Sequence, residues 1–143
     1  MICEVLTDYL EALNQNDVTR AASHCAPPLT MVLGDRVVAA STMPEIVIAY
    51  TTMLAALRAR ACARSEWTEI HVHNLANNLV LASGRATRYK TDGSLLEQIG
   101  ATYLMRKVGG SWKLSVLVAH DPDAIIPHRT GCAPPDSPKR DMR

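Results

Sequence analysis

The stretch SWKLSVLVAHDP, residues 111–122, decides the fold. Successive side chains of a strand point to opposite faces of its sheet, and Pro122 ends this strand. One predicted row, suited to an outer face that a partner covers, is Trp112, Leu114, Val116, Val118 and His120. The other row, of smaller residues suited to a concave wall, is Lys113, Ser115, Leu117, Ala119 and Asp121.

Three further strands precede this one, because the spacing of apolar residues has a period of two from Glu66 onward. They cover residues 66–75, 79–90 and 95–107. Their connections contain Asn77-Asn78, Asp92-Gly93 and Gly109-Gly110, residues that tolerate the positive φ of hairpin turns. The sequence therefore predicts a four-stranded antiparallel meander.

The first part of the chain has helical spacing instead. The apolar positions of the first helix are Ile2, Val5, Leu6, Tyr9, Leu10 and Leu13. Asp17 caps a short second helix that ends at Pro27-Pro28, and two extended pieces, 29–34 and 36–41, follow. Thr42 and Pro44 begin a third helix that runs to Cys62. Three helices before an antiparallel meander predict an α+β fold.

Length and composition limit the classes of function. The 143 residues predict one domain over residues 1–122 and a proline-rich, flexible tail over residues 123–143. A net charge of +1 gives no basis for binding nucleic acid or an acidic membrane surface. No apolar run approaches the roughly 20 residues of a membrane helix. The four cysteines form no CxxC pair, so we expect reduced thiols and a cytoplasmic location.

The order of these elements, with YLEALNQND near the start and GGSWKLSVLVAHDP near the end, resembles the nuclear-transport-factor-2-like superfamily. This superfamily includes ketosteroid isomerases and SnoaL-like polyketide cyclases. The resemblance covers about residues 1–122. It implies a cone in which a curved sheet wraps a long helix and leaves a pocket at its open end. It also implies a homodimer formed through the outer face of the sheet.

Within this superfamily, the ketosteroid isomerases allow a comparison of individual residues. Their oxyanion-hole tyrosine lies in a Tyr-x-x-Ala-Leu-Asn context, which residues 9–14 match. The resemblance implies that Tyr9 donates a hydrogen bond to a ligand carbonyl; the alternative is a core tyrosine bonded to a neighbour. The positions of the two isomerase acids fall near Leu33 and Thr102, which are not acidic. Asp35 is the carboxylate nearest to the base position.

Other candidates follow from strand parity. Asp121 belongs to the concave row and is a candidate base at the rim of the pocket. A His120-Asp121 dyad is less favoured, because adjacent strand residues face opposite ways. The family comparison places Gln98 and Thr102 on the pocket wall as polar groups that orient a ligand. The predicted ligand-contacting residues are Gln98, Thr102, Leu117 and Tyr50.

A zinc site is a further possibility. His71 and His73 share one strand face, and two such ligands could hold zinc with His120 as a third. A solvated or interfacial strand face explains the same pattern, and we predict no metal and no cofactor.

These observations lead to two hypotheses of function. The first hypothesis is a protein that binds a small apolar molecule in a pocket. In the enzymatic form of this hypothesis, the protein is an acid/base isomerase, cyclase or hydrolase that acts on a cyclic or carbonyl-bearing compound. In that form Tyr9 is the donor and Asp121 or Asp35 is the base. The alternative is a non-catalytic dimerisation or interaction module that uses the outer face of the sheet.

Overall fold

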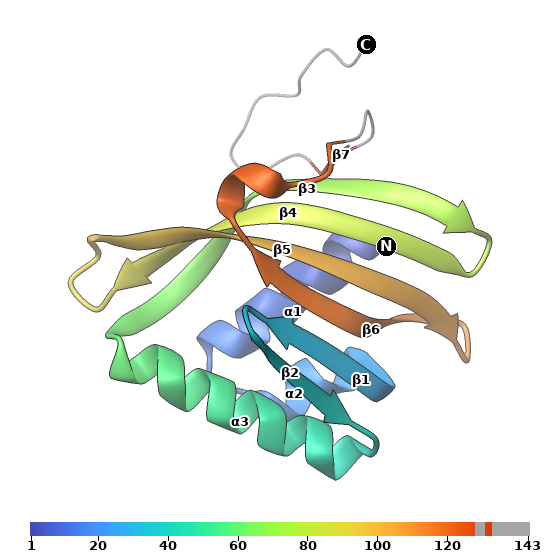
Figure 1. Ribbon diagram of the computed structural model, residues 1–143, viewed down its shortest axis with the longest axis horizontal. Coiled ribbons are helices and arrows are strands. Elements are labelled where there is room, and N and C mark those ends of the chain that lie inside the picture. The colour runs from blue at the N-terminus through green and yellow to red at the C-terminus, as the bar shows by residue number, and fades with distance from the viewer. Residues whose placement is uncertain (128–130, 133–143) are drawn as a thin grey trace.

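Seven described strands form one curved sheet in the order β2-β1-β6-β5-β4-β3-β7 (Figure 1). The computed structural model describes residues 1–127 and the backbone of residues 131–132, so most of the predicted flexible tail (123–143) lies outside the described residues. The strand bounds are β1 Cys25–Leu33, β2 Arg36–Ala40, β3 Cys62–Ala76, β4 Leu79–Lys90, β5 Leu95–Val108, β6 Ser111–His120 and β7 Gly131–Cys132. The predicted meander is confirmed as β3-β4-β5-β6, which pair antiparallel in sequence order.

Three α-helices pack against this sheet: α1 Ile2–Asn14, α2 Val18–Ser23 and α3 Met43–Ala59. The predicted caps are confirmed, because Asp17 accepts from the backbone N–H of Arg20 and Thr42 accepts from that of Glu45. Figure 1 shows the strands curving around α1, with α3 alongside β1 and β2. The α+β cone expected from the sequence is therefore the observed architecture.

Two boundaries differ from the sequence prediction. The Pro27-Pro28 pair does not end α2, which stops at Ser23; the prolines lie inside β1. They fit there because the pairing of β1 with β6 is irregular between Cys25 and Thr30, where no ladder N–H is required. Helix α3 ends at Ala59 instead of Cys62, and Ala61 has a positive φ of 63°. This turn starts β3 at Cys62, four residues before the predicted position.

A β-bulge in the β5–β6 pair changes which side chains of β6 face inward. The register shifts between Leu104 and Met105, because β6 contains one extra residue, Ser115, at this point of the pair. Leu114 and Leu117 are consequently both buried in the core. Ser115 instead accepts a hydrogen bond of 2.6 Å from Nε of Arg106. The expectation that Leu114 faces outward and Ser115 inward is therefore wrong.

The core lies between α1, α3 and the concave face of the sheet. Its largest fully buried side chains include Leu6, Tyr9, Ile46, Tyr50, Met105 and Leu114. Cys25 and Cys62 carry free thiols, whereas Cys3 takes part in a disulfide, so the expectation of reduced thiols is wrong for Cys3. Among the described residues, no helix combines the length and apolar character that crossing a membrane requires.

Candidate ligand-binding site

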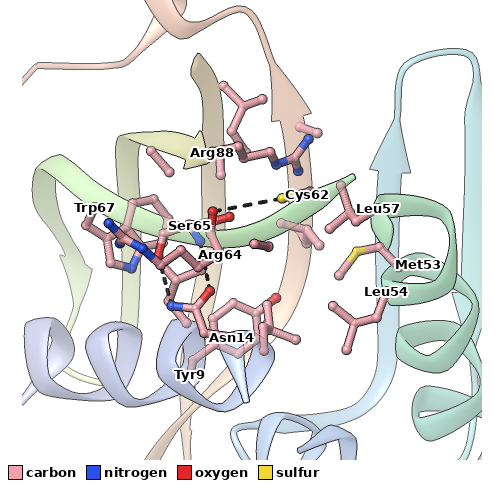
Figure 2. Close-up of a pocket in the computed structure, with 18 of the residues that line it drawn as sticks. Tyr9, Asn14, Met53, Leu54, Leu57, Cys62, Arg64, Ser65, Trp67 and Arg88 are labelled. Carbon is pink, nitrogen blue, oxygen red and sulfur yellow. Dashed lines mark hydrogen bonds between the residues drawn. The ribbon is translucent and has the colours of Figure 1, made fainter. Parts of the chain in front are cut away.

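A cavity of about 100 Å³ lies between the concave face of the sheet, α1 and the C-terminal half of α3 (Figure 2). Most of its lining is apolar. Six of the apolar lining residues are Leu10, Leu13, Met53, Leu54, Leu57 and Leu117. An engineered apolar cavity of roughly 150 Å³ admits benzene. The present cavity is about two thirds of that size, so a ligand enclosed in it is limited to about one ring.

Three aromatic rings form one wall of the cavity: Tyr9 of α1, Trp67 of β3 and Tyr103 of β5. The ring of Tyr103 meets those of Tyr9 and Trp67 edge to face, each at a centroid distance of 5.9 Å. Nε1 of Trp67 donates to the backbone oxygen of Leu6 at 3.1 Å, which fixes the indole against α1. Edge-to-face packing of this kind stabilises the rings beyond their buried area, so this wall is stiff.

The hydroxyl of Tyr9 is held by other buried groups. It lies 2.8 Å from the hydroxyl of Tyr50, which lies 3.5 Å from Sγ of Cys25. Burial raises the pKa of both tyrosines and raises that of Cys25 to about 11. All three groups are therefore protonated at neutral pH, and none can act there as a base.

Arg88 of β4 reaches the cavity with one donor unused. Its NH1 donates to Oε2 of Glu97 at 2.6 Å. Its Nε is buried and has no hydrogen-bond partner among the described residues. Glu97 also accepts two hydrogen bonds from Arg60, of 2.8 and 3.0 Å. The bonds from Arg60, and then the one from Arg88, lower the pKa of Glu97, so this carboxylate stays ionised.

The charged side chains that line the cavity are all cationic. Arg58 and Arg64 line it together with Arg88 (Figure 2 labels the last two). Among the described lining residues there is no aspartate, glutamate or histidine. Arg64 is paired with Glu66 and lies over the ring of Tyr89, 4.5 Å from its centroid. The lining offers hydrogen-bond donors and no carboxylate base.

Comparison with known proteins agrees with this architecture. A model of the family described as NTF2-like protein (DUF6841) matches residues 2–122. This chain belongs to that family. The NTF2-like resemblance predicted from the sequence is thereby confirmed. No curated protein matches the chain.

Solved structures show the same fold at low identity. An NTF2-like protein of unknown function from Shewanella oneidensis is 16% identical and has a TM-score of 0.68; the match covers 84% of this chain and 96% of that protein. A protein of unknown function with a cystatin-like fold from Nostoc punctiforme is 15% identical, with a TM-score of 0.69 and coverage of 88% and 89%. A ketosteroid isomerase-like protein from Erwinia carotovora atroseptica is 15% identical, with a TM-score of 0.64 and coverage of 82% and 90%. These likenesses concern the fold alone.

Two of the predicted site residues line the cavity of this NTF2-like chain. Tyr9 contributes its ring, and Leu117 lies on β6 beside Ala119, which is also in the lining. Tyr50 is fully buried behind Tyr9 and holds its hydroxyl without lining the cavity. Contact of these residues with a ligand stays a prediction.

Gln98 and Thr102 lie on the opposite face of the sheet from the cavity. The inward residues of β5 are Ile99, Ala101 and Tyr103, which alternate with them. Gln98 donates to Oγ1 of Thr87 at 3.4 Å. Oγ1 of Thr102 lies 2.9 Å from Oγ of Ser83. The expected facing of this row is therefore wrong, because the row of β5 that lines the cavity is the alternate one.

The two candidate bases, Asp121 and Asp35, are exposed and do not line the cavity. Asp35 lies in the turn between β1 and β2. His120 and Asp121 do not form a side-chain dyad: Nδ1 of His120 donates to the backbone oxygen of Asp121 at 2.8 Å. Nε2 of His120 lies 2.7 Å from Oγ1 of Thr102 and accepts its proton when the ring is neutral. A role of either aspartate as a base stays a prediction.

His71 and His73 lie on the same outer face. His71 pairs with Glu69 at 2.5 Å, and Glu69 also accepts from NH1 of Arg85 at 2.7 Å. Nε2 of His73 lies 3.0 Å from the backbone oxygen of Ile126. Within the described part of the chain, no three histidine, cysteine or acidic side chains gather as metal ligands would.

Sequence reasoning missed Trp67, Arg88, Glu97 and Tyr103 as parts of the site. One signal was present for Arg88: it ends the row Val80, Ala82, Gly84 and Ala86 on β4, whose other members are small or apolar. A charged residue at the end of such an inward row favours a functional role. Nothing local connects Glu97 with Arg60, because the turn at Ala61 brings them together.

Proposed function

We propose that this NTF2-like chain binds a small molecule of about one ring in the cavity between α1, α3 and the sheet. The observation that carries the proposal is a mostly apolar cavity whose lining includes Arg88, a residue with a buried Nε that has no partner among the described residues. Small-molecule sites typically combine an apolar lining with a few placed polar groups. Here the leucines and the aromatic wall supply the apolar lining, and Arg88 supplies a placed polar group.

The lining supports binding more than acid/base catalysis. Abstracting a proton from a carbonyl compound needs a base within hydrogen-bond reach of that proton. The described lining contains no carboxylate or histidine, and Tyr9 stays protonated. An isomerase, cyclase or hydrolase reaction would need Asp121 or Asp35 to reach the ligand from outside the lining. We therefore propose a binding protein as the function.

Filling the cavity tests this proposal. Ala119 lines the cavity, and its neighbour Val118 faces the other way on β6. We expect Ala119→Leu to weaken the binding of single-ring compounds by at least about tenfold, or about 1.4 kcal/mol. Val118→Leu, the matched control, should leave their binding unchanged.

The measurement is ligand-observed NMR with a panel of single-ring compounds, followed by titration of the hits. Circular dichroism would check that both variants fold, because added methylene groups in a packed region cost about 1–3 kcal/mol. The proposal fails if no compound binds the wild-type chain, or if Ala119→Leu binds every hit as well as Val118→Leu does.

A further inference from the structure

The cavity carries more positive charge than its neighbours neutralise. Three arginines line it, and no acidic side chain does so among the described residues. Glu97, just outside the lining, is shared between Arg60 and Arg88. Glu66 pairs with Arg64. Two carboxylates thus face four guanidinium groups, counting Arg58, and the balance around the cavity is positive.

Arg88, one of the lining arginines, also has a buried donor, Nε, without a partner among the described residues. A buried polar atom without a partner is rare in native structures and calls for an explanation. The backbone of β4 and the bond to Glu97 hold this guanidinium in place. An acceptor oxygen on a ligand would satisfy Nε, and a charged oxygen would make the stronger bond.

Tyr103 offers a second donor. The residue is 4% exposed and lines the cavity. Its hydroxyl makes no hydrogen bond with any described residue, and burial raises its pKa, so it keeps its proton. Tyr103 pairs with Ala82 of β4 and Arg88 pairs with Glu97 of β5, so the two residues lie six positions apart along the strands. Tyr103 therefore offers a neutral donor away from the arginines, and the place for a charged group is the arginine-lined end.

We infer that the ligand is a small ring acid whose carboxylate pairs with Arg88 and the other arginines of the cavity, while its ring packs against the leucines and Trp67. This inference rests on the proposed function and adds the class of ligand.

Paired probes test the inference: benzoate, which carries the charge, and benzamide, which has nearly the same shape without it. Isothermal titration of the full chain at neutral pH should give benzoate at least about tenfold tighter binding. Arg88→Gln should remove that preference by weakening benzoate alone. Arg36→Gln, at an exposed arginine outside this cavity, removes the same charge and should keep the preference.

Arg58→Gln gives a second readout that does not depend on Arg88→Gln folding, because Arg58 lines the cavity and is exposed. It should weaken benzoate several-fold and leave benzamide unchanged. Benzamide binding as tightly as benzoate would overturn the inference. If Ala119→Leu then abolished the binding of both, the proposed function would survive without it. Binding of neither probe to the wild-type chain would overturn the inference and count against the proposed function.

Discussion

The hydroxyl groups of Tyr9 and Tyr50 form a buried pair at 2.8 Å. The two hydroxyls differ in whether a second hydrogen-bond partner is available to them. Without Tyr9, the Tyr50 hydroxyl still has Sγ of Cys25 at 3.5 Å. Without Tyr50, the Tyr9 hydroxyl has no remaining partner among the described residues. A buried polar group left without its hydrogen bond costs about 1–3 kcal/mol, whereas removing both partners is nearly neutral.

We therefore predict that Tyr50→Phe lowers the free energy of unfolding by about 1–3 kcal/mol, and Tyr9→Phe by less. The double variant should lose less than the sum of the two, because the residues interact directly. Urea denaturation measures all three. Additive losses would contradict a coupled pair. If Tyr9 instead donates to a ligand, Tyr9→Phe will weaken ligand binding more than Tyr50→Phe does.

At this scale the sequence identified residues better than it identified their partners. The local context Tyr-x-x-Ala-Leu-Asn was enough to place Tyr9 beside the cavity. It could not show that the hydroxyl of Tyr9 meets Tyr50, because that contact joins α1 to α3 across 41 residues. Arg88 was missed for the same reason, since its partner Glu97 lies on another strand.

Helices α1 and α2 are joined by one carboxylate. Asp8 of α1 accepts a hydrogen bond of 3.2 Å from Nε of Arg20 and lies 2.6 Å from Nε2 of His24. The bonds from Arg20, and then from His24, lower the pKa of Asp8 from 3.8 to about 2. Because this pKa falls on folding, the pair stabilises the protein above pH 3.8, and the stabilisation is lost as the pH falls toward 2.

We predict that Asp8→Asn lowers the free energy of unfolding near pH 7 by only about 0.5–1 kcal/mol, because the Asp8 side chain is 43% exposed and solvent screens the pair. The difference from wild type should disappear near pH 2. Thermal denaturation at several pH values measures this. Asp35→Asn, at an exposed turn position, is the control and should show neither effect. A difference that stayed constant down to pH 2 would contradict the ionic origin.

Period and capping residues predicted most of the elements. Asp17 and Thr42 mark two helix starts correctly, because a cap is a contact between residues three apart. The inward position of Leu114 was not predictable, because a bulge depends on how β6 fits β5 and leaves no mark in either strand alone. One bulge is enough to exchange the two faces over half of a strand.

A homodimer through the outer face of the sheet stays a proposal for the whole molecule. Val116 and Val118 are half-buried on that face, in register with Thr30 and Val32 of β1. The chain itself crosses the other end of the face: Nε of Arg85 donates to the backbone oxygen of Pro122, and the backbone N–H of Ile126 donates to Oγ of Ser83. The surface left for a partner is therefore the β1–β6 end.

We predict that Val116→Glu converts a dimer to monomers, because a charge buried in an apolar interface is costly unless it is paired. Sedimentation equilibrium measures the oligomeric state. Val37→Glu, at a position 63% exposed on the edge strand β2, is the control and should leave the oligomeric state unchanged. A Val116→Glu protein that stays dimeric would exclude this face as the interface.

At the scale of the whole molecule, the sequence predicted the cone but not the charge of its cavity. The order of helices and strands is a local property that periodicity reports. The arginine-rich end of the cavity is assembled from the end of α3, β3 and β4. Only closure of the sheet brings these segments together, so spacing along the chain could not reveal it. A cytoplasmic location likewise stays a prediction.

The parallel pairing of β1 with β6 sets the order in which the molecule can be completed. β1 is held between β2 and β6, and β6 is the last long strand of the chain. The ribosome synthesises the chain from the N-terminus to the C-terminus, so β1 leaves the ribosome long before β6, its parallel partner. Contacts of such wide sequence separation slow folding. During synthesis, one edge of β1 stays open to unwanted pairing until almost the whole domain has been made.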